Sequence, residues 1–436
     1  MDASFKVGVG REIITPPLGT LLYGYPYERQ AESVHDDLRV VAFAFESAGE
    51  LAIMITADLC ELGVDVADEI RRLVSCATGV DISRIIFSAT HTHSGPCTMN
   101  LAGWGEADRE YSEKILYPMT VKASLAALSN MREAVMGVGS VESEVGINRR
   151  ERSVDGEVIL GQNPHGVFNK EMTVISFRDT DGRGIGCMIH YGAHGTSAGA
   201  GFEITRDWSG GMCDVLEAEC GMPTAFISGP TGDTGPRLPN GKTVGDIKQT
   251  EMLARRAGID AVKAYRSIRE YKAPSFAVVC DTVRLPFEPL MSYKEARESL
   301  LALGDVSTLS GRPKAAAEKY RAVMEIYENN TPHKQSLDFE VVIVSIGEVA
   351  FVPFPFEVFG EIALKISHHS PFSRTLTVNN ANGSLAYFPT ESEISLGGYE
   401  VFMFKHFLTY DLCADSDTVA VGEYVRILNE LEKSKK

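Results

Sequence analysis

No part of this sequence has the roughly 20 consecutive apolar residues that a membrane-spanning helix needs. The chain begins MDASFKVGVGREIITPP and so lacks the basic segment and the apolar stretch of a secretory leader. Its eight cysteines are scattered without a CxxC pair, and eight cysteines in 436 residues do not make a disulfide framework. These absences predict a cytoplasmic chain without a membrane span, whose thiols are mostly reduced and buried.

Positive charge is also in short supply. The formal net charge is −17, from 42 Lys and Arg against 59 Asp and Glu. Nucleic acids and anionic membrane surfaces both attract basic patches, so neither is an expected partner. The composition is otherwise that of an ordinary globular protein, and it leaves the oligomeric state open.

Strand-like and helix-like segments alternate along most of the chain. The segments 38–46 and 51–57 are apolar and β-rich, as buried strands are, and 64–76 has the single apolar face of an amphipathic helix. Further strands are expected at 84–89, 172–177, 184–190, 223–228, 276–284, 339–346 and 348–352, and further helices at 107–128, 208–220, 250–265, 293–303, 313–329 and 419–432.

This order predicts an α/β fold with a layered, mixed β-sheet core and flanking helices. No boundary is visible, so residues 1–436 are expected to form a single domain. The helical pair at about 292–330 interrupts the alternation. We interpret it as an insertion, either a lid or, more simply, a pair of extra packing helices.

The strongest local signal is the segment THTHSGP at 90–96, directly after the 84–89 strand. If that strand continues, His91 and His93 point to the same face, and the Gly-Pro pair then ends the strand. Both imidazoles would lie at the C-terminal edge of the sheet, where open α/β sheets place their sites and where two nitrogen ligands suit a metal. For this motif alone, a pair of ordinary edge histidines is an equally open alternative.

A third histidine follows another apolar strand, in the segment HYGAHGTS at 190–197. His190 is expected within the strand, buried and hydrogen bonded. His194 lies among small residues, which let backbone and ligand approach closely, so it is the better ligand candidate.

Two further segments have the composition of site loops. Residues 228–237 are rich in glycine and have Asp233 as their only carboxylate, although a plain turn has the same composition. Glu357 stands in an aromatic and proline-rich stretch, where an unpaired carboxylate is expensive to bury. We expect Glu357 to pair with a cation or bind a metal, unless it lies exposed at an edge.

Together these segments resemble a known family. THTHSGP is similar to the signature of the neutral, non-lysosomal ceramidases and their bacterial relatives. The resemblance covers essentially the whole chain, because the other segments follow in the family's order: VGVGREIITPP, VHDDL at 34–38, GINRR at 146–150, the His194 turn, Gly232-Asp233, Pro355-Phe356-Glu357 and Gly398-Tyr399-Glu400.

The resemblance implies a site for zinc. It implies that His93 stabilises the oxyanion of a tetrahedral intermediate and that Arg149 orients the substrate. Asp207 and Asp233 would lie close by as supporting groups. The implied zinc ligands are two histidines, a glutamate and a tyrosine, at positions that match His91, His194, Glu357 and Tyr399.

Two departures from the family bear on the substrate. Ceramide-cleaving members carry a serine in a Gly-Asp-x-Ser-Pro pattern, which here has Gly235 in the serine position and Thr234 one position away. Thr234 is kept as a candidate catalytic residue. The C-terminal immunoglobulin-like domain of those ceramidases is also missing from the sequence. Both departures favour a small, soluble amide or ester over ceramide, whereas hydrolysis by metal-activated water needs no side-chain nucleophile.

The sequence therefore predicts a zinc-dependent amidohydrolase that uses metal-activated water, with zinc lowering the pKa of that water to about 7. Tyr399, His93 and Asp233 are possible proton donors to the leaving group, and Asp233 could instead orient a ligand histidine. An esterase or deacetylase with the same centre and a catalytically silent, ligand-binding relative are the alternatives. Nitrogen and oxygen ligands also admit iron, manganese or nickel.

Overall fold

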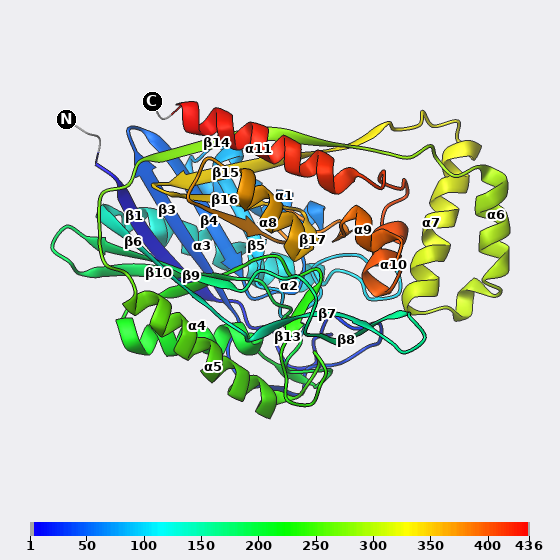
Figure 1. The fold of residues 1–436 in the computed structure, drawn as a ribbon, viewed down its shortest axis with the longest axis horizontal. Helices are drawn as coiled ribbons and strands as arrows, with labels where there is room; N and C mark the ends of the chain where they lie inside the picture. Colours follow the sequence, from blue (N-terminus) through cyan, green and yellow to red (C-terminus); the bar gives the residue numbers. More distant parts are fainter. Residues whose placement is uncertain (1–3, 435–436) are drawn as a thin grey trace.

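Two stacked β-sheets with helices on both outer faces form the body of the computed structural model, which describes residues 4–434 (Figure 1). The larger sheet has the order β12-β10-β9-β6-β1-β3-β4-β5. Its β10–β12 and β4–β5 pairs are parallel and its other pairs are antiparallel. Its strands are β1 (Lys6–Ile13), β3 (Arg39–Ser47), β4 (Glu50–Ala57), β5 (Ile85–Ala89), β6 (Arg132–Glu142), β9 (Glu171–Asp179), β10 (Gly184–Tyr191) and β12 (Thr224–Ser228).

The second sheet has four strands in the order β14-β15-β16-β18. Three small sheets, β13-β7-β8, β17-β19 and β11-β2, lie around the two large ones. The strands of these sheets are β14 (Phe276–Pro286), β15 (Ser336–Ile346), β16 (Val349–Pro353), β18 (Arg374–Val378), β7 (Gly146–Arg152), β8 (Val158–Asn163), β13 (Thr234–Pro236), β17 (Phe356–Val358), β19 (Ala386–Phe388), β2 (Ser33–Val34) and β11 (Glu203–Ile204).

Strands of the larger sheet are apolar on both faces because each face is covered. In β3, Phe43 and Phe45 face the second sheet and join Phe351 in one core, whereas Ala42 and Ala44 face helices in another. Successive side chains of a strand point to opposite faces, so a continuous apolar run is what a doubly covered strand requires. The layered, mixed-sheet α/β fold expected from the sequence is confirmed.

Helices form the two outer layers. The helices α1, α3, α4 and α5 pack on the larger sheet, and α8 and α11 pack on the second sheet. The pair α6 and α7 projects from one end of the molecule, next to α10 (Figure 1). The helices are α1 (Val64–Thr78), α2 (Arg109–Tyr111), α3 (Tyr117–Ser129), α4 (Asp207–Cys220), α5 (Ile247–Arg266), α6 (Tyr293–Ala302), α7 (Gly311–Glu328), α8 (Gly360–His369), α9 (Glu391–Ile394), α10 (Tyr399–His406) and α11 (Ser416–Ser434), with short helical turns at Ile82–Arg84, Ser112–Leu116 and Val306–Thr308.

The THTHSGP segment departs from the expected geometry. Strand β5 ends at Ala89, and His91 has a φ of 72°, in the left-handed region that a strand cannot contain. His91 and His93 therefore do not share a face through strand alternation, and the Gly-Pro pair does not end the strand. The chain turns away from the sheet edge one residue after β5 instead.

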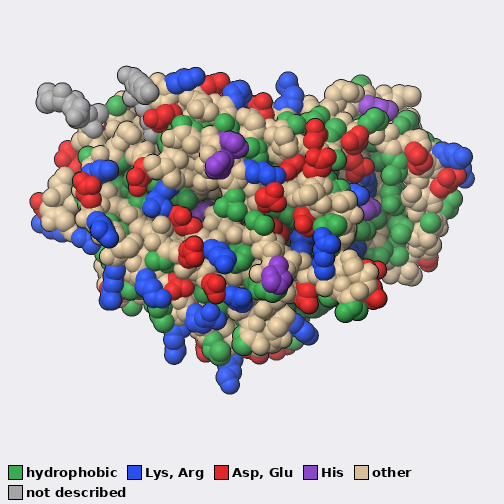
Figure 2. Space-filling model, in the orientation of Figure 1, with side chains coloured by type: hydrophobic (Ala, Val, Ile, Leu, Met, Phe, Trp, Pro, Cys, Tyr) green, Lys and Arg blue, Asp and Glu red, His purple; other side chains and the backbone are tan. Residues whose placement is uncertain are grey.

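Other gross features agree with the composition. Acidic and basic side chains are interspersed over most of the face shown in Figure 2. Among residues 4–434, no helix is long and apolar enough to cross a membrane.

Candidate metal centre and its cavity

Three segments that are far apart in the sequence bring two histidines and a glutamate together. His91 follows β5, His194 follows β10, and Glu357 is the central residue of β17. The Oε2 atom of Glu357 lies 3.2 Å from His91 Nε2 and 3.0 Å from His194 Nε2. All three side chains are buried, and their ligand atoms lie within 4.8 Å of one another, close enough to hold one metal ion.

The ring of His91 is oriented by a backbone carbonyl. Its Nδ1 lies 2.8 Å from the carbonyl oxygen of Cys60. A carbonyl can only accept, so donation from Nδ1 to Cys60 would leave the Nε2 lone pair facing Glu357. The amide nitrogen of Asn380 also lies 2.9 Å from Nδ1, and a hydrogen bond from this nitrogen would use Nδ1 as the acceptor instead.

The ring of His194 is held in the same way. Its Nδ1 lies 2.8 Å from the carbonyl oxygen of Thr231 and 3.3 Å from that of Thr234. Backbone carbonyls, rather than the carboxylate of Asp233, therefore set its tautomer and leave Nε2 as an acceptor. The indole nitrogen of Trp208 donates to the His194 carbonyl at 2.9 Å and fixes the backbone of the turn.

Three buried ligand atoms, His91 Nε2, His194 Nε2 and Glu357 Oε2, thus converge on one point. The Nε2 atom of His91 and the Oε2 atom of Glu357 are buried and have no hydrogen-bond partner among the described residues. Burial raises the pKa of Glu357, but the neighbouring His91 and His194 lower it by more than burial raises it. The net pKa lies well below its ordinary value, so the group is a carboxylate. Burial lowers the pKa of His91, but the charge of Glu357 raises it by more, so the net pKa is raised. The surroundings of this ring therefore favour a positive charge. Because unsatisfied buried acceptors are costly, a divalent cation fits this position.

His93 lies beside the cluster, and neither of its ring nitrogens has a hydrogen-bond partner within residues 4–434. Its ring centroid is 5.0 Å from that of His91 and 5.7 Å from that of His194. Burial, together with these two histidines, holds the pKa of His93 well below its ordinary value, so the ring is neutral. The loop that contains Gly24 packs closely on this ring. A Cβ at Gly24 would collide with His93, so the contact requires glycine. His93 is therefore fixed in place and has a free N–H to donate.

Three tyrosines, Tyr23, Tyr387 and Tyr399, line the same cavity, and only Tyr399 was expected. Tyr387 lies opposite Glu357 in the parallel β17–β19 pair, and its hydroxyl is 3.2 Å from His194 Nε2. Tyr399, the residue expected from the resemblance, begins α10 and packs edge to face on Tyr387 with ring centroids 5.7 Å apart. The phenol hydrogen bonded to the cluster is thus that of Tyr387.

Arg149 lies behind Tyr387 rather than at the cluster. Its Nε donates to Glu400 Oε1 at 2.8 Å, and its guanidinium carbon lies 5.4 Å from the centre of the Tyr387 ring. Arg150 donates to the other oxygen of Glu400 at 2.7 Å. The pair of arginines therefore fixes the first turn of α10, which also carries Tyr399.

Asp233 and Thr234 lie next to the cavity but face away from the cluster. Asp233 Oδ1 accepts from Gly360 N at 2.8 Å and from Thr234 Oγ1 at 3.3 Å, and Oδ2 accepts from Asn148 Nδ2 at 3.3 Å. Asp233 lines a separate cavity of about 290 Å³. The two side chains support the loop that holds His194.

Gly235, in the position of the family serine, belongs to a packed strand pair. It lies opposite Ile147 in the β13–β7 ladder. A Cβ at this position would come within 2.7 Å of the Thr243 side chain. The position is therefore packed for glycine, and a serine would require Thr243 to move.

Asp207 braces the turn that follows His194. Its Oδ1 accepts from Ser197 Oγ at 2.5 Å and from Trp208 N at 2.7 Å, and its Oδ2 accepts from Ala198 N at 2.8 Å. Because Trp208 also holds the His194 carbonyl, Asp207 acts on the cluster through the backbone.

Two cavity residues carried no sequence signal. The Tyr23 hydroxyl donates to Glu61 Oε2 at 2.9 Å, and both side chains line the cavity that contains His91 and Glu357. Burial, followed by the charge of Glu357, raises the pKa of Glu61 to about 8. Neither residue belongs to a motif with a known spacing, so only the tertiary structure could reveal them. Cys60 also approaches His91, with Sγ 4.0 Å from Nδ1.

The fold and this cluster define an α/β protein with a buried candidate metal centre. Residues 5–256 match the family model of the neutral/alkaline non-lysosomal ceramidases, N-terminal region. The match covers more than half of the chain, so the chain belongs to this family.

Individual relatives agree with the family. Neutral ceramidase A of Dictyostelium discoideum is 27% identical over 221 residues, which is 45% of this chain and 29% of that protein. Neutral ceramidase B of the same organism is 26% identical over 246 residues, 52% of this chain and 34% of that protein. The matched stretch thus spans about a third of the length of these relatives.

Solved structures show the same fold. The neutral ceramidase from Pseudomonas aeruginosa superposes with a TM-score of 0.74 at 20% identity, over 99% of this chain and 75% of that chain. A ceramidase complexed with C2 superposes with a TM-score of 0.72 at 18% identity, over 99% of this chain and 76% of that chain.

Proposed function

We propose that this chain is a metal-dependent hydrolase of a linear amide, with zinc held by His91, His194 and Glu357. The convergence of three buried ligand atoms on one point carries the proposal. Two imidazoles and one carboxylate form a ligand set that zinc sites commonly use. The amide bond is proposed from the family, whose relatives are named ceramidases.

Tyr387 is proposed as the fourth protein group at the metal, in place of Tyr399. Its register opposite Glu357 and the 3.2 Å contact of its hydroxyl with His194 Nε2 support this assignment. Tyr399 is proposed instead as a residue whose hydroxyl faces the substrate. It lines the cavity, and its ring packs against Tyr387.

The bound metal would supply Lewis acidity, polarising a carbonyl and lowering the pKa of a water. His93 donates its free N–H to the oxygen that gains negative charge, a contribution that is usually large in such sites. His93 and Tyr399 both line the cavity and are the candidate proton donors, whereas Asp233 and Thr234 hold the His194 loop. Arg149 and Glu400 position Tyr387 and Tyr399.

A small, soluble substrate is proposed rather than ceramide. The packing of Gly235 against Thr243 supports this, because it leaves no serine hydroxyl at the family position. The same centre would also hydrolyse an ester, so activated esters belong in the substrate screen.

We also propose that the chain acts as one catalytic unit. The side chains of the cluster come from β17 and from the ends of β5 and β10, and the cavity wall extends to α10. The pair α6 and α7 is proposed as an insertion into this unit.

Metal content of the purified protein tests the ligand assignment directly. We expect about one zinc per chain in the wild type, and loss of zinc in His91→Ala and His194→Ala. The exposed His368 at the end of α8 provides the control, since His368→Ala should retain the metal. A metal-free wild type, or full occupancy in both cluster variants, would contradict the proposal. Amide hydrolysis should then be lost in the same variants that lose the metal.

A further inference from the structure

A second cavity lies next to the candidate metal centre. Its volume is about 730 Å³, whereas the inner cavity at the cluster has only about 20 Å³, room for about one water. The two cavities share Tyr23, Leu101 and Trp104 as wall residues. A substrate whose reacting group enters the inner cavity can therefore place its remainder in this neighbouring outer cavity.

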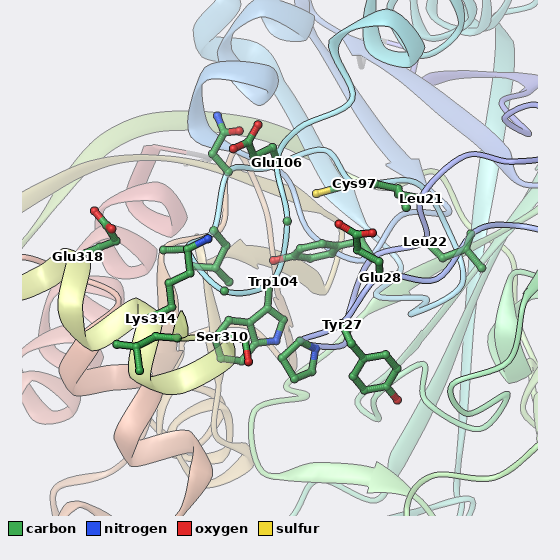
Figure 3. A pocket seen from close by; sticks show the side chains of 18 residues that line it. Leu21, Leu22, Tyr27, Glu28, Cys97, Trp104, Glu106, Ser310, Lys314 and Glu318 are labelled. Carbon is green, nitrogen blue, oxygen red and sulfur yellow. The ribbon is translucent and has the colours of Figure 1, made fainter. Parts of the chain in front are cut away.

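The outer wall is formed by α7 and the loop that carries Trp104 (Figure 3). The backbone N–H of Gly311 donates to the carbonyl of Gly103 at 3.2 Å, and neither glycine can be replaced without strain, because both have positive φ. The ring of Trp104 is held by an edge contact with Phe407, with centroids 5.8 Å apart. The wall is thus part of the fixed structure, and it has a defined chemistry.

Charged side chains at this cavity favour a cation. Glu28 and Glu106 border the cavity, and within residues 4–434 neither has an ion-pair partner. Glu318 reaches the cavity from α7, but Arg321 pairs with it at 2.8 Å. Lys314 is the only lysine or arginine among the wall residues (Figure 3).

We propose that the outer cavity binds a cationic group of the substrate, such as a primary ammonium, between the aromatic wall and the two free carboxylates. Trp104 and Tyr27 bring aromatic rings to the wall, and Glu28 and Glu106 bring negative charge, a combination that suits an alkylammonium ion. The substrate is therefore an amide of a diamine or of a basic amino acid side chain. This assignment of the bond rests on the proposed function, whereas the cation site rests on the outer cavity alone.

Binding of small probes tests the cation site without any chemistry. The probes are pentylammonium, pentanol and pentanoate, which share one carbon chain and differ in charge, titrated calorimetrically into the purified protein. We expect pentylammonium to bind most tightly. Glu28→Gln and Glu106→Gln should each weaken it about two- to five-fold, as exposed charge pairs do. Lys314→Met should strengthen it about two-fold, and pentanol should respond to none of these changes.

The opposite signs at Lys314 and at the two glutamates separate a charge effect from a folding defect, because damage to the fold weakens binding in every case. Equal binding of the three probes, or tightest binding of pentanoate, overturns the cation site. A second comparison uses N-acetylcadaverine and N-hexylacetamide as substrates. Hydrolysis of both amides at equal KM overturns the cation site and leaves the proposed hydrolase intact. Ammonium binding with neither amide cleaved leaves the cation site intact and counts against the hydrolase.

Discussion

At the scale of single residues, hydrogen-bond acceptors decide what the cluster can bind. The carbonyls of Cys60 and Thr231 take the Nδ1 protons of His91 and His194. Each ring is left with a lone pair on Nε2, and both lone pairs point at a carboxylate. Coordination of a metal through Nε2 needs this tautomer, and the backbone carbonyls at Nδ1 favour it.

Substitution of Tyr387 and of Tyr399 should have different effects on zinc binding and turnover. Tyr387→Phe removes the hydroxyl next to His194 Nε2, so we expect retained zinc or turnover to fall about 10- to 100-fold. Tyr399→Phe should leave zinc in place and lower turnover only. Two measurements on each variant distinguish the roles of the two tyrosines: the zinc retained after dialysis, and kcat. The reverse pattern would make Tyr399 the ligand.

Asp233 predicts a pH dependence of stability away from the cluster. Burial raises the pKa of Asp233 to about 7. The folded state therefore holds a proton between about pH 4 and pH 7 that the unfolded state has lost, so this residue lowers stability as the pH rises through that window, by at most about 4 kcal/mol. Asp233→Asn should remove this slope, so that the variant loses less stability than the wild type between pH 5 and pH 8. Urea unfolding at pH 5 and pH 8 measures it.

A matched buried carboxylate gives the contrast. Asp207 accepts from four donors on Ser197, Ala198 and Trp208, and an asparagine cannot accept them all. Asp207→Asn should therefore lose stability at both pH values. Equal pH slopes in the wild type and in Asp233→Asn would show that Asp233 is ionised throughout this range.

At the scale of elements, α7 is tied to the body of the molecule at two points. Near its N-terminus, Gly311 contacts the loop of Trp104. In its middle, the buried Lys319 donates to the carbonyl of Lys405 and, at 2.6 Å, to Asp411 Oδ1. These contacts make the helical pair a fixed wall of the outer cavity, which argues for the packing interpretation over a lid.

Loss of the Lys319 anchor should loosen this wall without unfolding the protein. Lys319→Met leaves a buried carbonyl and Asp411 without their donor, which we expect to cost about 1–3 kcal/mol locally. Hydrogen exchange across residues 293–328 should then speed up. Lys314→Met, an exposed change on the same helix, is the control and should leave exchange unchanged. Unchanged exchange in Lys319→Met would mean that packing alone holds α7.

At the scale of the whole molecule, the two large sheets meet at the candidate site. The segment after β18 is inserted between the two edges of the larger sheet, with Asn379 N bonded to Ser228 O at 2.9 Å and Asn382 N bonded to Phe87 O at 2.7 Å. Asn380 of this segment reaches His91. The cluster therefore joins parts of the chain that no single layer contains.

Removal of the metal should lower the stability of the whole protein. An ion bound only in the folded state adds about 2.7 kcal/mol at a concentration 100 times its Kd. We expect a chelator to lower the Tm of the wild type by about 3–8 °C and to have no effect on His194→Ala. Differential scanning calorimetry with and without chelator measures this, with His368→Ala as a control that should behave like the wild type. An unchanged Tm of the wild type after addition of the chelator would count against a metal at the cluster.

The sequence by itself determined the layers of this protein and most of its elements. Apolar strands and amphipathic helices have periodicities that local composition reveals, and so 38–46, 51–57 and 64–76 were predicted correctly. The surroundings of Glu357 likewise indicated a buried carboxylate in need of a cation. The family was recognisable because THTHSGP and the segments after it keep their order.

Only the tertiary structure decided which side chains meet. His91 lies beyond the end of β5 and itself has a left-handed backbone conformation, so strand alternation gave the wrong reason for its position. Tyr387 meets the cluster because β19 pairs with β17, a contact that no local pattern encodes. Glu61, Tyr23 and the outer cavity also depend on packing between distant segments. Side-chain spacing along the chain constrains neighbours on one element, whereas contacts between elements depend on the packing of all the layers together.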